Sequence, residues 1–340
     1  VTDGWGSIYK FDVAQNGKLI WKMNPDTDHD FPGAVTCCGI NNRGVGLYMD
    51  KVISHTLDGR LIITNKASGE IENEVQLADA SIAEVITAAP LIVKDSAITG
   101  VAGAEYGIRG WLHSTNLKDG SKNWRTYTIP APDEPGGDTW KQGPEAHSKD
   151  GWMHGGGSTW VVGSWDADLD VIYWGVGNPG PDWDNEYRPG DNLYSNSVLA
   201  LDADTGKIKW YFQYTPNDPY DFDGVNEQTL VNAKIFGKQT KAVLHADRNG
   251  FAYALDRESG KFLWGTPFVK KLDWTAGLDK YTGRPMDYDP NKDVQRYVPS
   301  SSAFRAQPEA TSCPGNMGGK NWPPTAYDPD RNMYYIPVIE

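Results

Sequence analysis

Four side chains that carry oxygen lie in or beside turn-forming segments of this sequence. Glu105 and Asn178 each stand among glycines, and Asp221 and Asp223 flank one phenylalanine. Hard cations take carboxylate and amide oxygens as ligands, and carboxylates two positions apart in an extended segment point to the same face. The pattern predicts a cation site. The alternative is a set of solvated acidic turns, which are common in a chain of net charge −13.

The adjacent cysteines Cys37 and Cys38 are a second chemical signal. Cysteine is often a small, buried, reduced hydrophobic residue. A disulfide between neighbours instead makes a rigid ring, and it persists only in an oxidising compartment. From the pair alone both states stay open, and the reduced state is the commoner one. The third cysteine, Cys313, is expected to find a partner beyond Glu340.

These residues need a scaffold, and a repeated pattern indicates which one. An aspartate opens a turn, a glycine closes it, and a tryptophan follows four positions later, as in residues 202–210 and 256–264. Aspartate bonds its own backbone in such turns and glycine supplies a positive φ, so each copy predicts a β-hairpin. The glycines of the five copies are Gly17, Gly69, Gly120, Gly206 and Gly260. The residues four positions later are Trp21, Asn73, Trp124, Trp210 and Trp264.

The spacing of the copies predicts the fold class. The glycines are 52, 51, 86 and 54 residues apart. A period of about 50 residues with four strands per unit is typical of a β-propeller, and the recurrent tryptophan would pack between neighbouring blades. An irregular β-sandwich is the alternative. The longest interval would hold a further blade and an inserted loop at about 130–149. We therefore expect one all-β domain over residues 1–340 with about five to six blades.

Composition argues against nucleic acid as a partner and against a membrane-spanning segment. The ends of the sequence indicate whether it is a whole protein. The excess of 45 acidic over 32 basic residues argues against nucleic acid. No apolar run approaches the roughly 18 residues that span a bilayer. The sequence begins at Val1 without a methionine or signal-like segment and ends in an apolar run. We expect a piece of a longer protein.

Six motifs in order along nearly the whole chain resemble the quinoprotein alcohol dehydrogenases, the pyrroloquinoline quinone (PQQ) enzymes that include methanol and ethanol dehydrogenases. They occupy residues 37–44, 103–110, 177–181, 188–192, 247–250 and 318–322. The resemblance implies an eight-bladed β-propeller with tryptophan-docking motifs, which agrees with the repeat. It also implies that part of a blade precedes Val1 and that further blades follow Glu340.

The resemblance implies a binding site for PQQ. Cys37 and Cys38 resemble the vicinal disulfide that covers one face of the quinone, and Trp160 resembles the indole on the other face; both surfaces are polarisable and rigid. Arg248 resembles the cation beside the reactive carbonyl. The groups that resemble the cofactor's polar partners are Arg43, Thr87, Ser158 and the Ala104 backbone, and those that resemble the rim are Asn321 and Trp322.

The resemblance also assigns metal and catalytic roles. Glu105, Asn178 and Asp221 resemble the metal ligands, with Asp221 as the catalytic base and Arg248 stabilising the developing oxyanion. Asp223 stands where calcium enzymes commonly have a small neutral residue and lanthanide-dependent members have aspartate. A trivalent ion needs more compensating charge, so Asp223 argues for a lanthanide, with calcium as the alternative.

The function so implied is the periplasmic oxidation of a small primary alcohol to the aldehyde by hydride transfer to metal-bound PQQ. Electrons are expected to pass to a soluble c-type cytochrome, because an acidic surface suits a basic partner. A homodimer is a further assembly that we consider. The alternatives are a non-catalytic propeller scaffold and a quinoprotein dehydrogenase for another alcohol or a sugar. A scaffold needs the repeat but not the cysteine pair together with the oxygen ligands.

Overall fold

The hairpins predicted from the aspartate–glycine turns form, and one of them shows how. Between β13 (Ser197–Asp202) and β14 (Ile208–Gln213), the Asp202 carboxylate accepts a hydrogen bond from Thr205 N at 3.0 Å. Gly206 N donates to Asp202 O at 2.9 Å, and Gly206 has a φ of 69°, which residues with a side chain rarely adopt. Local chemistry therefore turns the chain back on itself.

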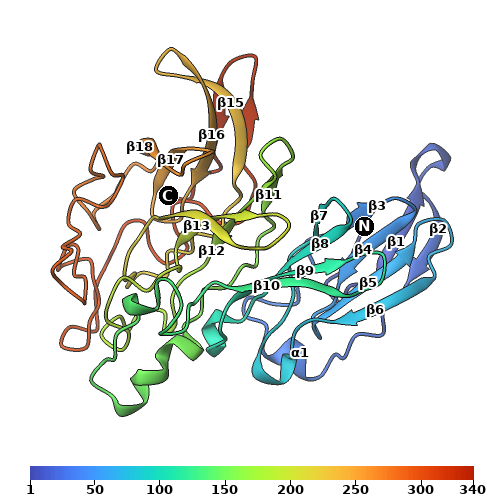
Figure 1. Cartoon of the computed structure of the whole chain (residues 1–340), viewed down its shortest axis with the longest axis horizontal. Coiled ribbons are helices and arrows are strands. Elements are labelled where there is room, and N and C mark those ends of the chain that lie inside the picture. The colour runs from blue at the N-terminus through green and yellow to red at the C-terminus, as the bar shows by residue number, and fades with distance from the viewer.

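The computed structural model describes residues 1–340, except for the side chains of residues 146 and 147. The strands form four antiparallel sheets of four strands and two of two strands. In each four-stranded sheet the strands pair in chain order, so each sheet is one propeller blade. Figure 1 shows these sheets following one another, from the blue N-terminal ones on the right to the orange one on the left and the red one at the top. The prediction of an all-β partial propeller is confirmed.

The strands are named here blade by blade. The first, two-stranded sheet holds β1 (Ile8–Asp12) and β2 (Lys18–Met23). The next blade holds β3 (Gly46–Tyr48), β4 (Lys51–His55), β5 (Arg60–Asn65) and β6 (Ile71–Gln76). It is followed by β7 (Leu91–Val93), β8 (Ser96–Gly100), β9 (Trp111–Asn116) and β10 (Lys122–Tyr127). The third complete blade holds β11 (Ser164–Asp166), β12 (Val171–Val176), β13 and β14. The fourth holds β15 (Thr229–Ile235), β16 (Lys238–Ala246), β17 (Phe251–Asp256) and β18 (Phe262–Pro267), and the last sheet holds β19 (Ala326–Asp328) and β20 (Met333–Tyr335).

Helices are short and lie in the connections. They are α1 (Phe31–Ala34) and the 3-10 helices η1 (Val13–Gln15), η2 (Ala80–Ile82), η3 (Ala104–Tyr106), η4 (Gly137–Thr139) and η5 (Ala146–His154). The segment expected as a loop at about 130–149 thus contains η4 and the start of η5. None of the helices in the described part of the chain has the length and apolar character needed to cross a bilayer.

The first strands of successive blades follow one another around the propeller axis. β3 lies beside β7, β7 beside β11, β11 beside β15, and β15 beside β19. The core lies between the blades rather than within them. Trp124 of one blade, for example, shares a buried cluster with Ile172, Leu199 and Ala203 of the next.

The predicted tryptophan contact between blades is confirmed at three interfaces. A Cβ atom added to the docking glycine would lie 2.5 to 2.7 Å from the indole ring of the preceding blade, so only glycine fits there. The pairs are Trp21 with Gly69, Trp124 with Gly206, and Trp210 with Gly260.

At a fourth interface between blades, asparagine replaces the tryptophan of the motif. There Asn73 and Val75 lie against Gly120, 3.1 and 3.0 Å from where a Cβ would be. The Trp124 interface shows what the tryptophan adds, because its Nε1 also donates a hydrogen bond to Ala203 O at 3.1 Å. Asn73 therefore still contacts the docking glycine, but it buries less apolar area than a tryptophan does.

Candidate functional site

Strand order places every predicted site residue at one end of the propeller. Antiparallel strands reverse direction at each step, so the connections after the second and fourth strands of a blade lie at the same end. The docking turns, which join third to fourth strands, lie at the opposite end. The predicted residues follow β2, β6, β8, β10, β12, β14, β16 and β18, all of them second or fourth strands or their equivalents.

Three of the predicted cofactor residues contact one another. The Arg43 guanidinium lies over the Trp160 ring, 4.7 Å from its centroid. Arg43 N donates a hydrogen bond to Thr87 O at 3.0 Å. The Thr87 hydroxyl is buried and has no hydrogen-bond partner, although a buried hydroxyl normally finds one. Its orphaned donor fits a site that a polar ligand completes.

Cys37 and Cys38 form a disulfide in the connection after β2. Cys38 has a φ of 66° and is exposed to solvent, so the rigid ring presents a surface. The sequence alone left the reduced pair as the commoner state, and the structure contains the disulfide. Cys313 is free.

A glycine allows three site residues to approach one another. A Cβ atom on Gly177 would lie 2.3 Å from Asp223 Oδ1 and 2.9 Å from Ser158 Oγ. Gly177 N also donates to Ser158 O at 2.7 Å. The buried Ser158 and Asp223 side chains therefore share a cradle that exists only because position 177 has no side chain.

Asp223 links the predicted metal ligand Asn178 to the predicted catalytic Arg248. Asp223 Oδ1 accepts a hydrogen bond from Asn178 N at 2.9 Å, and Asp223 Oδ2 accepts one from Arg248 Nη1 at 2.5 Å. Both oxygens thus have a protein donor, and each keeps a second lone pair for another partner.

Arg248 reaches Asp221 from the same position. Its Nη2 lies 3.5 Å from Asp221 Oδ2 and also donates to Asn316 O. The guanidinium is buried, and its Nε has no partner. Gly319 N donates to Arg248 O at 2.9 Å, which places the segment of Asn321 and Trp322 next to this arginine. Trp322 is 58% exposed, as a residue at a rim would be.

Asp221 is held in a strained backbone position by a neighbouring aspartate. Its φ is 63°, which is uncommon for a residue with a side chain. The buried Asp218 carboxylate accepts hydrogen bonds from Tyr220 N at 2.8 Å and Phe222 N at 2.7 Å. Phe222 packs with Trp274 in the core. The turn is thereby fixed on both sides of Asp221.

Glu105 and Ala104 lie in η3, beside a hollow of about 490 Å³. Glu105, Gly180 and Asp182 are among the residues that line this hollow. Asp182 Oδ1 accepts a hydrogen bond from Asn178 Nδ2 at 2.8 Å. The structure thus brings a carboxylate that the sequence analysis did not select into contact with a selected residue.

Negative charge is concentrated in this region. Desolvation, and then the charge of Asp223, raise the pKa of Asp221 well above its ordinary value. The same two causes raise the pKa of Asp182. Desolvation, followed by Asp223 and Asp182, raises the pKa of Glu105, and water screens part of that effect because Glu105 is exposed. The carboxylates disfavour one another's charged forms, and a cation among them would relieve this repulsion.

The predicted metal ligands do not form a closed cage. Within the part of the chain that the structure describes, no group of three or more His, Cys, Asp and Glu side chains is arranged to hold a metal ion. The predicted set includes the Asn178 amide, and its role stays a prediction. The chemistry of its donors, oxygen atoms with an excess of negative charge, fits a hard cation.

Sequence reasoning missed Asp182, Asp218 and Arg188. Arg188 is fully buried and donates to Pro181 O at 2.9 Å and to Asp218 O at 2.6 Å, so it joins two loops. The sequence signal was that Asp182 follows Asn178 by four positions in a turn and that Asp218 begins the segment of Asp221. The contacts themselves depend on how distant loops meet.

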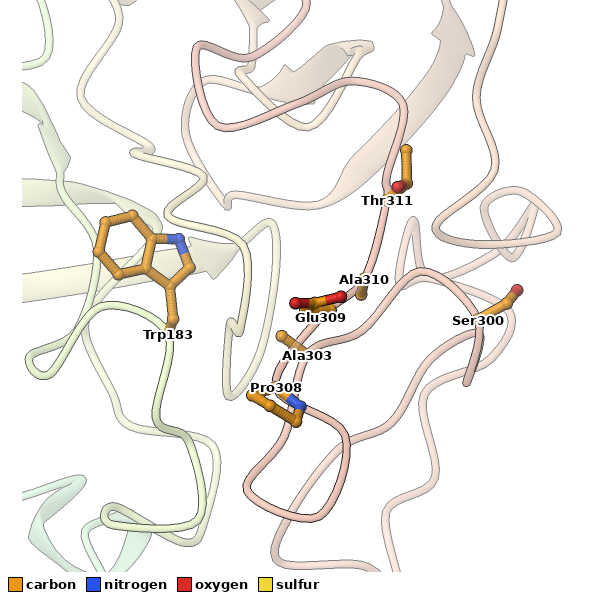
Figure 2. Close-up of a pocket in the computed structure, with 7 residues that line it drawn as sticks. All are labelled: Trp183, Ser300, Ala303, Pro308, Glu309, Ala310 and Thr311. Atoms are coloured by element: carbon orange, nitrogen blue, oxygen red, sulfur yellow. The ribbon is translucent and has the colours of Figure 1, made fainter.

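A second, larger hollow of about 900 Å³ shares the lining residue Trp183 with the first. Figure 2 shows the Trp183 indole standing across this hollow from Ala303, Pro308 and Glu309, which belong to the segment between β18 and β19. Trp183 is 52% exposed. Trp183 therefore lines both hollows and is itself partly open to solvent.

Comparison with known proteins decides the family. Residues 6–270 match the model of the PQQ family described as glucose/ethanol/alcohol dehydrogenase, β-propeller domain. The chain belongs to this family. The disulfide, the docking tryptophans and the loops described above are therefore those of a quinoprotein propeller.

Relatives within the family include quinoprotein alcohol dehydrogenases and lanthanide-dependent methanol dehydrogenases. The quinoprotein alcohol dehydrogenase PedH of Pseudomonas putida is 40% identical over 350 residues, which cover 100% of this chain and 57% of PedH. The lanthanide-dependent methanol dehydrogenase of Methylacidiphilum fumariolicum is 36% identical, over 97% of this chain and 54% of the relative.

Solved structures agree with the fold. A europium-containing methanol dehydrogenase superposes with a TM-score of 0.88 at 33% identity, over 98% of this chain and 58% of that one. The quinohemoprotein alcohol dehydrogenase of Comamonas testosteroni superposes with a TM-score of 0.85 at 33% identity, over 99% and 49%. This chain thus spans about half of the length of the proteins it matches.

Proposed function

We propose that this protein oxidises a small primary alcohol to the aldehyde with PQQ and a lanthanide ion. The observation that carries the proposal is the set of contacts in which Asp223 bonds both Asn178 and Arg248, and Arg248 reaches Asp221. The names of the relatives, which include alcohol dehydrogenases and lanthanide-dependent methanol dehydrogenases, support the same reaction.

The residues present fit PQQ. The Cys37–Cys38 disulfide and the Trp160 indole would cover its two faces, and Arg43 would leave the indole to meet a carboxylate of the cofactor. The orphaned Thr87 hydroxyl and the cradled Ser158 hydroxyl would bond its polar edge. When bound, PQQ would supply hydride-acceptor chemistry and the metal ion would supply Lewis-acid chemistry.

The chain's own residues supply the proton chemistry. Asp221 accepts the hydroxyl proton of the alcohol as general base. Arg248, held by Asp223 and Asn316 O, presents a fixed positive charge where negative charge develops. The carboxylates of Glu105, Asp221 and Asp223, with the Asn178 amide oxygen, would be the donors for the cation.

Compartment and electron acceptor follow from two chemical features. A disulfide between adjacent cysteines, of which Cys38 is exposed, persists in an oxidising compartment, which supports the periplasm. The net charge of −13 favours a basic partner, which supports a soluble c-type cytochrome as acceptor.

Reconstitution tests the proposal. The chain is mixed with PQQ and either La³⁺ or Ca²⁺, and bound PQQ and alcohol-dependent dye reduction are measured. We expect PQQ binding, activity with La³⁺, and loss of that activity in Asp223→Ala. The matched control is Asp204→Ala, which removes an exposed aspartate in a hairpin turn at the opposite end.

The outcomes separate the parts of the proposal. Activity with Ca²⁺ that survives Asp223→Ala would overturn the lanthanide assignment and keep the enzyme class. Bound PQQ without any alcohol-dependent reduction would overturn the substrate. Absence of PQQ binding would favour the scaffold.

A further inference from the structure

The amide of Asn178 has a partner that fixes which of its two ends faces the site. We propose that Asp182 is a positioning residue for the metal centre: by accepting the hydrogen bond from Asn178 Nδ2 it holds the amide oxygen Oδ1 toward the cation. The inference rests on the proposed function and names a residue outside the set predicted from the sequence.

The geometry of Asn178 supports this role. Its backbone N donates to Asp223 Oδ1 at 2.9 Å, so the residue is anchored on the main chain. Its Nδ2 donates to Asp182 Oδ1 at 2.8 Å and makes a longer contact, 3.4 Å, with Pro179 O. An asparagine amide has one donor end and one acceptor end, and only the acceptor end ligates a cation. Without the Asp182 carboxylate, only the longer contact with Pro179 O would oppose a rotation of the amide that presents N–H groups to the positive charge.

Hydrogen bonds from Arg188 fix the backbone of the loop that carries Asp182. Arg188 donates to Asp182 O at 3.0 Å and to Pro181 O at 2.9 Å, and the same guanidinium bonds Asp218 O at 2.6 Å. Because Asp218 organises the turn that carries Asp221, one buried arginine sets the distance between the Asp182 loop and the catalytic loop.

A neighbouring aspartate, Asp184, carries the same charge but does not contact Asn178. Asp184 lies two positions later and lines the same hollow. Its carboxylate instead forms an ion pair with Arg305 at 2.7 Å. Asp184 is therefore a matched control of the same residue type on the same turn.

The test measures binding of Tb³⁺ alone to the full chain by titration calorimetry. We expect Asp182→Ala to weaken Tb³⁺ binding by about 10- to 100-fold, as loss of a partner that orients a ligand does. Asp182→Asn keeps an oxygen that can accept from Nδ2, so it should retain most of the affinity. Asp184→Ala should bind as the wild type does, and circular dichroism checks that each variant is folded.

A double-mutant cycle separates positioning from a general structural effect. If Asp182 acts through Asn178, then Asp182→Ala should add no further loss in an Asn178→Ala background. An additional loss there, or an Asp182→Asn variant as weak as Asp182→Ala, overturns the positioning role. So does an Asp182→Ala variant that binds like the wild type.

Failure of the proposed function looks different. A wild-type chain that gives no binding heat with Tb³⁺ overturns the metal site and the role of Asp182 together. A wild type that binds, with Glu105→Gln weakened and Asp182→Ala unchanged, overturns the role of Asp182 alone.

Discussion

At the scale of single residues, the site depends on a missing side chain as much as on the groups that are present. Gly177 stands between Ser158 and Asp223, and Asp223 connects Asn178 with Arg248. The sequence showed glycines around Asn178 but not which of them faces a carboxylate. Only the structure shows that the space where a side chain at position 177 would lie is filled by the side chains of Asp223 and Ser158.

Gly177→Ala should displace Asp223 and disconnect Asn178 from Arg248. Because the added Cβ meets Asp223 Oδ1 at 2.3 Å, we expect a loss of stability of about 1–3 kcal/mol from overpacking and a loss of PQQ and Tb³⁺ binding. Equilibrium dialysis with PQQ measures the second effect. Gly315→Ala is the control, since the nearest atom to its Cβ is 4.0 Å away. Unchanged PQQ binding in Gly177→Ala would contradict the cradle.

His55 gives a residue-scale prediction of pH dependence. It is buried, Nδ1 faces Ala88 O and Nε2 faces Thr99 Oγ1, each at 2.9 Å. Burial lowers its pKa from 6.5 to about 4. The folded state therefore binds a proton less readily than the unfolded state, and stability falls as the pH drops from about 6.5 to about 4.

The full loss at His55 is roughly 3 kcal/mol, from 1.36 kcal/mol per pKa unit. Urea unfolding at pH 7.5 and pH 5 measures it. The His55→Gln variant should lose less stability than the wild type over this interval. Equal losses in the two proteins would show that His55 does not govern the acid response.

At the scale of the element, the hairpin and its tryptophan were the most predictable parts of the molecule. Turn chemistry is local, so the aspartate–glycine spacing predicted both the hairpin and the residue that packs on the next blade. The connections at the other end were not predictable in this way. Arg188 and Asp218 gain their roles from a contact between loops that are 30 residues apart, and no local pattern encodes such a contact.

Trp124→Ala should be costly and Asn73→Ala should not. Trp124 is 7% exposed, packs on Gly206 and bonds Ala203 O, so its removal should lower the free energy of unfolding by about 3–5 kcal/mol. Asn73 occupies the corresponding position at the neighbouring interface and is exposed to solvent, so its truncation should change the free energy of unfolding by about 0.5 kcal/mol or less. Urea unfolding compares the two. Equal effects would contradict the role of the indole between blades.

At the scale of the whole molecule, charge is the property that the sequence determines most directly. The excess of 45 acidic over 32 basic residues gives the molecule a net charge of −13 and so a negative electrostatic potential over its surface. The family, the all-β class and the propeller were also predictable, because repeats and ordered motifs extend over nearly the whole chain. The shape of the hollows was not, since it depends on segments such as residues 299–311 that carry no periodic pattern.

Electron transfer to a basic c-type cytochrome should be salt-dependent. Long-range attraction to the acidic surface speeds the encounter, and salt screens it. We expect the association rate to fall by about tenfold or more between low and physiological ionic strength, measured by stopped-flow reduction. An acidic cytochrome is the control. A rate that is independent of salt would contradict a docking partner selected by charge.

The division of the connections between two ends has a practical consequence for attaching this protein to a solid support. The turn between β15 and β16 joins a first to a second strand, so it lies opposite the site. At that turn Phe236 is 84% exposed, and a Cβ on Gly237 would meet nothing within 4 Å; Figure 1 shows the hairpin projecting from the body of the molecule. A linker introduced there would orient the molecules on an electrode with the disulfide and Trp160 facing the solution.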